Sequence, residues 1–178
     1  GSAASCWAQL QPVEVEIEPR IVEVYLKEIQ ASTAVREAWA GMQRRGVGWR
    51  ERYTKHARIE MLRAGAAAAT QPVPMAMDVL LRSDGPVAVD RTLVFQVLND
   101  GQPLAELAVE FQSAASGLGI WRRTDAQGRV SFSPPLPGRW LLCGTELYPS
   151  TTRSDWWESR FVTLAFEVPA AGAAAATR

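Results

Sequence analysis

Apolar and acidic residues alternate strictly from Val13 to Glu18. This period of two is typical of a strand that has one solvent-facing side. Pro19 ends the alternation, and the apolar residues after it fall at helical spacing. Because proline suits the first turn of a helix, we expect a short helix to follow.

A second helix is predicted directly afterwards. Ser32 or Thr33 suits the N-cap, although Glu37 lies one residue too far from Thr33 for a capping box. The apolar stripe of this helix consists of Val35, Trp39 and Met42, and Gly46 and Gly48 end it.

The segment from Trp49 to Arg63 fits either a strand or a helix, and we favour the strand because its apolar positions align better with a period of two. In that strand one face carries Tyr53, Ala57, Ile59 and Met61. The other face carries His56, Arg58 and Glu60, which we expect to point into water.

From Met75 to Val168 the pattern is that of short strands separated by turns. Turn signals occur at 99–102, 125–128 and 134–138. The strand candidates are 75–82, 91–98, 104–111, 119–124, 130–132, 140–147 and 161–168.

The predicted fold class is therefore mainly β, an antiparallel β-sandwich of immunoglobulin-like or transthyretin-like type with a short N-terminal α/β segment. We expect that segment to cover 1–65, the sandwich 72–168 and a disordered tail 169–178, with an Ala-rich linker at 64–70. The expected core residues are Phe132, Trp140, Leu142, Val162, Leu164 and Phe166.

Composition narrows the function classes. Basic and acidic residues balance at 19 each, so no overall field favours nucleic acid, and we expect no nucleic-acid partner. The basic residues between Arg44 and Arg63 are interleaved with Glu51 and Glu60, which favours a solvated face with local ion pairs. No apolar run reaches the length of about 18 residues that a membrane-spanning helix needs.

The two cysteines, Cys6 and Cys143, could form one disulfide in an oxidising compartment or remain two thiols. We predict two free thiols, with Cys143 buried and Cys6 accessible. Gly1-Ser2 has the form of a remnant left by cleavage of an added tag, so we expect the natural N-terminus to lie elsewhere.

Two sequence motifs carry a family resemblance. The segment 124–132, T-D-A-Q-G-R-V-S-F, followed by L-P-G-R-W at 136–140, resembles a motif of transthyretin-like and carboxypeptidase-regulatory-like modules. The segments 25–28, 52–57, 100–105 and 156–158 complete a resemblance to the bacterial periplasmic family called domain of unknown function 4198. The chain is similar to the C-terminal part of such proteins, because their earlier sandwich and their N-terminal histidine have no counterpart in it.

The resemblance implies a periplasmic or secreted location and, from the labels given to family members, a link to nickel or cobalt uptake. A membrane transporter or an outer-membrane receptor component would then be the partner. His56 is the only histidine, and with Glu60 it forms the candidate metal site. Two ligands fall short of the three or four that a selective transition-metal site needs, so we expect weak metal binding at most.

We expect no enzymatic activity, no catalytic residue and no cofactor. Hydroxyisourate hydrolases share a transthyretin-like fold, but their several histidines and C-terminal signature are missing from this sequence. The nucleophile-elbow pattern G-x-S-x-G is also missing from it.

The predicted function is thus a non-enzymatic periplasmic accessory or binding protein. The alternative is a cell-envelope module that binds glycan or protein. Candidate partner-binding residues are Trp156, Trp157, Arg52, Tyr53 and Lys55. Since adjacent strand residues point to opposite faces, we expect one of the two tryptophans to be packed in the core and the other to be free.

Overall fold

The structure is a computed structural model that describes residues 4–61 and 70–170. The predicted linker lies outside these residues except for Thr70, and the predicted tail lies outside them from Ala171 onward. Neither described helix is long and apolar enough to cross a membrane.

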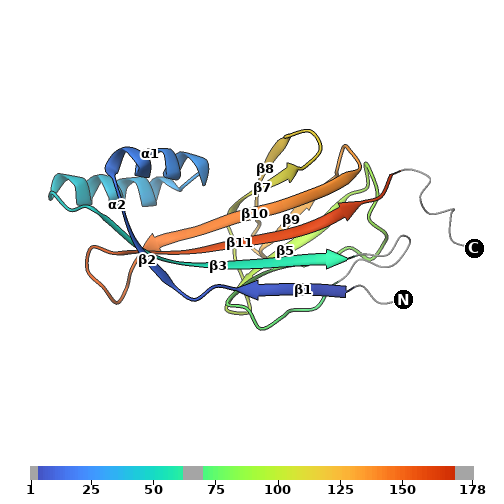
Figure 1. Ribbon diagram of the computed structural model, residues 1–178, viewed down its shortest axis with the longest axis horizontal. Coiled ribbons are helices and arrows are strands. Elements are labelled where there is room, and N and C mark those ends of the chain that lie inside the picture. The colour runs from blue at the N-terminus through green and yellow to red at the C-terminus, as the bar shows by residue number, and fades with distance from the viewer. Residues whose placement is uncertain (1–3, 62–69, 171–178) are drawn as a thin grey trace, which may run out of the picture. The chain divides into compact units, whose positions relative to one another are not determined.

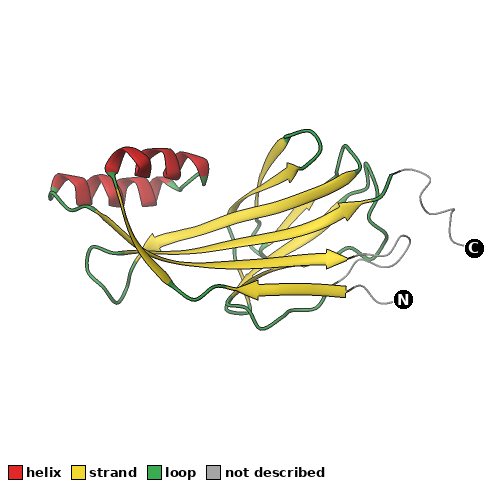
Figure 2. Cartoon of the chain, in the orientation of Figure 1, coloured by secondary structure: helices red, strands yellow, loops and turns green. Residues whose placement is uncertain are grey.

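Two helices follow the first strands, as the sequence predicts (Figure 2). Helix α1 (Pro19–Glu28) has proline at its first turn, where the missing N–H costs no hydrogen bond. Helix α2 (Thr33–Arg44) is capped by Ser32, whose hydroxyl accepts a hydrogen bond from the Val35 N–H at 3.3 Å.

The described chain contains eleven strands, including β1 and the short β6, which the hydrophobic pattern does not predict. Their bounds are β1 (Ala4–Gln9), β2 (Val13–Ile17), β3 (Trp49–Met61), β4 (Met77–Leu81), β5 (Leu93–Asn99), β6 (Gln102–Pro103), β7 (Ala108–Ser113), β8 (Gly119–Arg123), β9 (Arg129–Phe132), β10 (Gly138–Pro149) and β11 (Trp157–Val168).

These strands form two sheets (Figure 1). The seven-stranded sheet has the order β1-β3-β11-β10-β7-β8, with β2 also paired to β3. In the four-stranded sheet, β5 pairs with β4, β6 and β9. The predicted mainly β, antiparallel sandwich with a short N-terminal helical segment is confirmed.

The chain divides into two compact units that differ from the expected domain boundaries. We call Gly1–Gln9, His56–Gly144 and Val162–Arg178 the sandwich unit, and Leu10–Lys55 with Thr145–Phe161 the helical unit. The boundaries differ because β10 and β11 are each twelve residues long and contribute residues to both units.

Side chains from both sheets form the core of the sandwich unit. All six residues predicted for this core are buried. Phe111 stacks on Phe132 with ring centroids 4.0 Å apart, and Trp140 meets Phe132 edge-on at 5.0 Å. The Trp140 indole also donates a hydrogen bond to the Leu136 carbonyl at 3.0 Å, so its polar atom is satisfied.

The turn before β9 requires glycine. Gly128 has a φ of +66°, and a Cβ there would lie 2.6 Å from the Val97 carbonyl oxygen. Any side chain would therefore strain the backbone and push apart two hydrogen-bonded strands, because the Val97 N–H donates to the Gly128 carbonyl.

Truncating Trp140 tests this core. We expect Trp140→Ala to lower the free energy of unfolding by about 3–5 kcal/mol, since it removes a buried aromatic side chain and leaves a cavity. Trp121→Ala is the matched control, because Trp121 is only half-buried and should cost less. Chemical denaturation measures both, and an unchanged stability of Trp140→Ala would contradict the core assignment.

Candidate functional site

The C-terminal half of β3 reverses the predicted faces. His56, Arg58 and Glu60 are at most 3 % exposed, whereas Ile59 and Met61 are each 51 % exposed. The prediction that the charged residues face water is therefore wrong. The reversal needs a physical cause, because it takes charges out of water and leaves large apolar side chains in it.

The cause is a buried ion cluster around Arg58. Its guanidinium forms an ion pair with Glu60 on the same strand and another with Asp78 on β4, at 2.8 Å. The guanidinium also donates to the Gln71 carbonyl at 2.8 Å. Buried charges are tolerated when they are paired and fully hydrogen-bonded, as they are here.

Backbone and hydroxyl groups satisfy the two carboxylates further. The Ser5 hydroxyl on β1 donates to Glu60 at 2.7 Å. Asp78 accepts from the N–H groups of Val73 at 3.1 Å and Val79 at 2.8 Å. The cluster thus ties β1, β3 and β4 together within the sandwich unit.

This cluster bears directly on the metal hypothesis. Glu60 is engaged by Arg58 and Ser5, and His56 is 1 % exposed rather than a partly exposed strand residue. Among the described residues, no three His, Cys, Asp or Glu side chains gather in a way that could hold a metal ion. Binding of a metal by His56 and Glu60 would require this packing to open.

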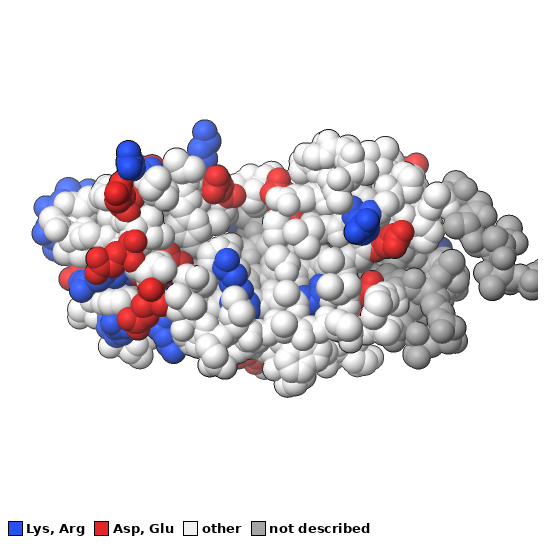
Figure 3. All heavy atoms as spheres, in the orientation of Figure 1, with Lys and Arg blue, Asp and Glu red and all other residues white. Residues whose placement is uncertain are grey.

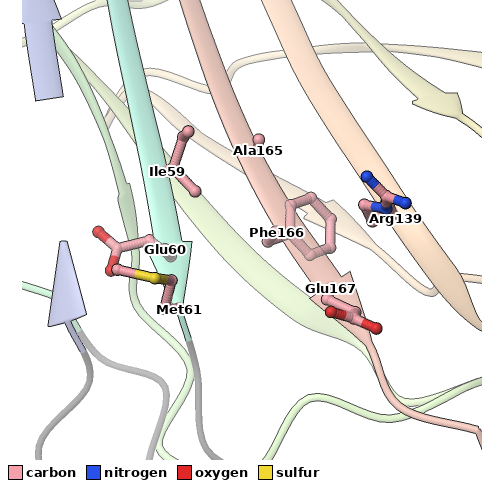
Figure 4. A pocket seen from close by; sticks show the side chains of 7 residues that line it. All are labelled: Ile59, Glu60, Met61, Arg139, Ala165, Phe166 and Glu167. Atoms are coloured by element: carbon pink, nitrogen blue, oxygen red, sulfur yellow. The ribbon is translucent and has the colours of Figure 1, made fainter. Parts of the chain in front are cut away.

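The opposite face of the same strands carries an apolar hollow, which we call the outer patch. It has a volume of about 250 Å³ and is lined by Ile59, Glu60, Met61, Arg139, Ala165, Phe166 and Glu167. Figure 4 shows Ile59 on β3 beside Ala165 on β11, with Arg139 on β10 and Glu167 near the patch border. An apolar patch with a polar rim is typical of a contact surface for another molecule.

Charged side chains are distributed unevenly over the visible surface. In Figure 3 both signs gather over the helical unit, while the surface over the strands of the sandwich unit is mostly uncharged. The prediction of a solvated face on which Glu51 and Glu60 form local ion pairs is wrong, because both acids are buried. Arg45 pairs instead with the distant Asp155, at 2.6 Å. Arg63 lies outside the described residues.

A second buried carboxylate lies in the helical unit. Glu51 is 2 % exposed and accepts hydrogen bonds from three neutral donors: the Trp49 indole at 2.8 Å, the Tyr25 hydroxyl at 3.1 Å and the Ser159 hydroxyl. Burial, followed by the charge of Glu51, raises the pKa of Tyr25 well above its usual range. Tyr25 therefore stays protonated and can donate.

The candidate partner-binding residues divide between core and surface. Trp157 is fully buried and stacks on Trp49 at 4.5 Å. Trp156 is half-buried, with the Arg153 guanidinium 3.3 Å and the Arg50 guanidinium 5.4 Å from its ring centroid. The two guanidinium groups thus already contact the indole on which a sugar would have to stack.

Of the other candidates, Arg52, Tyr53 and Lys55, the structure brings Tyr53 and Lys55 together. Tyr53 packs edge-on against Phe161 at 5.9 Å, with the Lys55 ammonium 5.4 Å from its ring centroid. Arg52 is exposed. Tyr53 therefore has a packing role, and the structure does not bring these three residues together with Trp157, which lies in the core.

Both cysteines are free thiols. Cys6 is exposed, as predicted, but Cys143 is only partly buried. Burial, and to a lesser extent the charge of Glu110, raises the pKa of Cys143 to about 11. At neutral pH it therefore remains a thiol and reacts slowly.

A model of a known protein family matches the middle part of the chain. The model of the family described as Domain of unknown function (DUF4198) matches residues 50–145, more than half of the 178 residues. The chain belongs to this family. No curated protein and no solved structure matches it. The DUF4198 match includes Arg58, Glu60 and Asp78, so the ion cluster lies within the segment that defines the family.

Neither buried cluster is predicted by the sequence pattern. For Glu51 a weak signal existed, since a glutamate between Trp49 and Tyr53 in a strand is a candidate for an aromatic-lined position. For Arg58 the only local partner among the described residues is Glu60, two residues away, and its partners Ser5 and Asp78, 53 and 20 residues away, have no local signal.

Replacing Arg58 tests how much the buried cluster contributes to the free energy of unfolding. We expect Arg58→Met to lower the free energy of unfolding by about 3–5 kcal/mol, because two buried carboxylates lose their counter-charge. Combining it with Glu60→Gln and Asp78→Asn should recover part of the loss. Arg52→Met on the same strand is the exposed control and should change stability by less than about 0.5 kcal/mol. Equal stability of Arg58→Met and wild type in urea denaturation would refute the role of the cluster.

The affinity of the chain for transition-metal ions tests the metal hypothesis. We expect isothermal titration of nickel, cobalt, copper and zinc, with any added histidine tag removed, to give dissociation constants no tighter than about the micromolar range. His56→Gln should leave the values unchanged. A stoichiometric nanomolar complex that survives gel filtration would overturn this expectation.

Proposed function

We propose that the chain is a non-enzymatic periplasmic or secreted binding module that holds a protein partner on the outer patch. The observation that carries this proposal is the reversed strand β3, which places Ile59 and Met61 in solvent at 51 % exposure each. The Arg58 cluster forces these two apolar side chains outward, and the patch that they form offers an apolar contact surface to another molecule.

The charged residues at the border of the outer patch indicate which groups a partner would present to it. Arg139 and Glu167 are both exposed and border the apolar hollow. A complementary surface would therefore present an apolar side chain into the hollow, with an acidic group facing Arg139 and a basic group facing Glu167. Proteins offer this combination readily, whereas a glycan lacks both the apolar side chain and the basic group.

The glycan alternative has less support. Its main candidates were Trp156 and Trp157, of which the first already contacts Arg50 and Arg153 and the second is buried. A link to nickel or cobalt uptake rests on the family resemblance, which would make the partner a transporter or receptor component. The outer patch is compatible with such a partner.

Site-specific photo-crosslinking tests the proposal. We expect a benzoylphenylalanine at position 59 to give one discrete protein adduct in cell-envelope preparations of the source organism. The same probe at Ser131, an exposed position of β9, should not. Met61→Lys should abolish the adduct formed from position 59, because a charge in the hollow opposes an apolar contact.

Two outcomes would refute this function. One is the same adducts from positions 59 and 131, which would indicate non-specific contact. The other is the absence of any protein adduct from position 59 while the chain carrying the probe remains folded by circular dichroism.

A further inference from the structure

Strand β1 lies at an edge of the seven-stranded sheet, and its contact with the segment before β4 is a hydrogen bond from the Ala76 N–H to the Gln9 side chain. In the described part of the chain it is the last strand of the seven-stranded sheet on that side, as Figure 1 shows, and all six of its residues are exposed. Edge strands are normally blunted by a charge, a proline, a bulge or a cover, since their free N–H and C=O groups pair readily with another strand. The sequence A-S-C-W-A-Q of β1 carries neither charge nor proline.

Other strands at the border of this sheet are protected. Strand β8 carries Arg122 and Arg123, and β2 carries Glu14 and Glu16. Two copies of either strand would bring like charges together on pairing. Two copies of β1 would meet no such repulsion, so of the three described strands compared, β1 is the one compatible with pairing to itself.

The backbone direction of β1 identifies its free groups. The Leu10 N–H donates to the Lys55 carbonyl of β3 at 2.9 Å, and this pair continues the β1–β3 register, in which Ala8 faces Ala57 and Cys6 faces Ile59. Because hydrogen-bonding direction alternates along a strand, the N–H and C=O groups of Ser5, Trp7 and Gln9 point away from β3.

We propose that β1 pairs antiparallel with β1 of a second copy of this chain, on a two-fold axis at Trp7. This register brings Ser5 opposite Gln9 and Trp7 opposite Trp7, which uses all the outward groups in about six hydrogen bonds. Trp7, 45 % exposed, gains a cross-strand aromatic neighbour from the second copy. The interface is isologous and closes on itself, so it gives a dimer and no fibre.

The interface is small, so the dimer is weak. It rests on one pair of short strands and two tryptophans, which places it among weak, transient contacts. The pairing uses the outward backbone groups of β1, whereas the proposed function uses the side chains of Ile59 and Met61 on the neighbouring strand.

Sedimentation velocity over a range of concentrations tests the dimer. We expect Trp7→Pro to weaken the association at least about tenfold, because it removes an outward N–H and the aromatic contact without touching the bonds to β3. Met61→Lys should leave the association unchanged, because Met61 lies in the outer patch. A wild-type protein that stays monomeric up to millimolar concentration would overturn the proposal, as would a dimer that Met61→Lys abolishes and Trp7→Pro does not.

Disulfide trapping tests the register even if Trp7→Pro fails to fold. On the axis at Trp7, position 8 of one copy lies opposite Cys6 of the other, whereas position 4 lies opposite Leu10. In a Cys143→Ser background, Ala8→Cys should therefore form covalent dimers on diamide oxidation at least about tenfold faster than Ala4→Cys, since only the former places two thiols within bonding range. Equal rates for the two variants would show that this register is wrong.

Discussion

The ion pairs of Arg58 determine which side of β3 faces the interior. A guanidinium that holds Glu60 and Asp78 and is itself 1 % exposed cannot turn toward water without leaving two carboxylates unpaired in the interior. Since side chains alternate along a strand, fixing Arg58 inward also fixes Ile59 and Met61 outward. The outer patch therefore exists because of the cluster behind it.

The two compact units accommodate a buried glutamate in different ways. In the sandwich unit Glu60 is neutralised by a cation, whereas in the helical unit Glu51 is held by three neutral donors. Charge neutralisation makes the first cluster sensitive to the loss of a single partner, because an uncompensated charge then remains in the interior. In the cluster of the helical unit, a tyrosine, a tryptophan and a serine share the charge of Glu51. The loss of any one of these donors removes a single hydrogen bond.

Much of the fold could be predicted because local pattern and tertiary environment agree over most of the chain. Val162, Leu164 and Phe166 alternate with less apolar residues and all lie in the core, and the turn at Gly128 follows from the positive φ that only glycine adopts freely. Strand β1 could not be predicted, since A-S-C-W-A-Q has no periodic contrast. The faces of β3 were predicted wrongly, because the burial of Arg58 depends on Ser5 and Asp78, which are distant in sequence.

The contact role that we propose for the outer patch rests on the reversal of β3. Exchanging Ile59 and Glu60 would restore the local pattern of the strand, but it would leave the buried Arg58 without one of its two carboxylate partners. Behind the patch lie the Arg58 cluster of β3 and the core residues Leu164 and Phe166 of β11, so Ile59 and Ala165 form a fixed surface. Met61, an unbranched and flexible side chain, can adjust to the shape of a partner. A rigid apolar platform with one adaptable residue loses little conformational entropy on binding, and this favours affinity even for a small contact area.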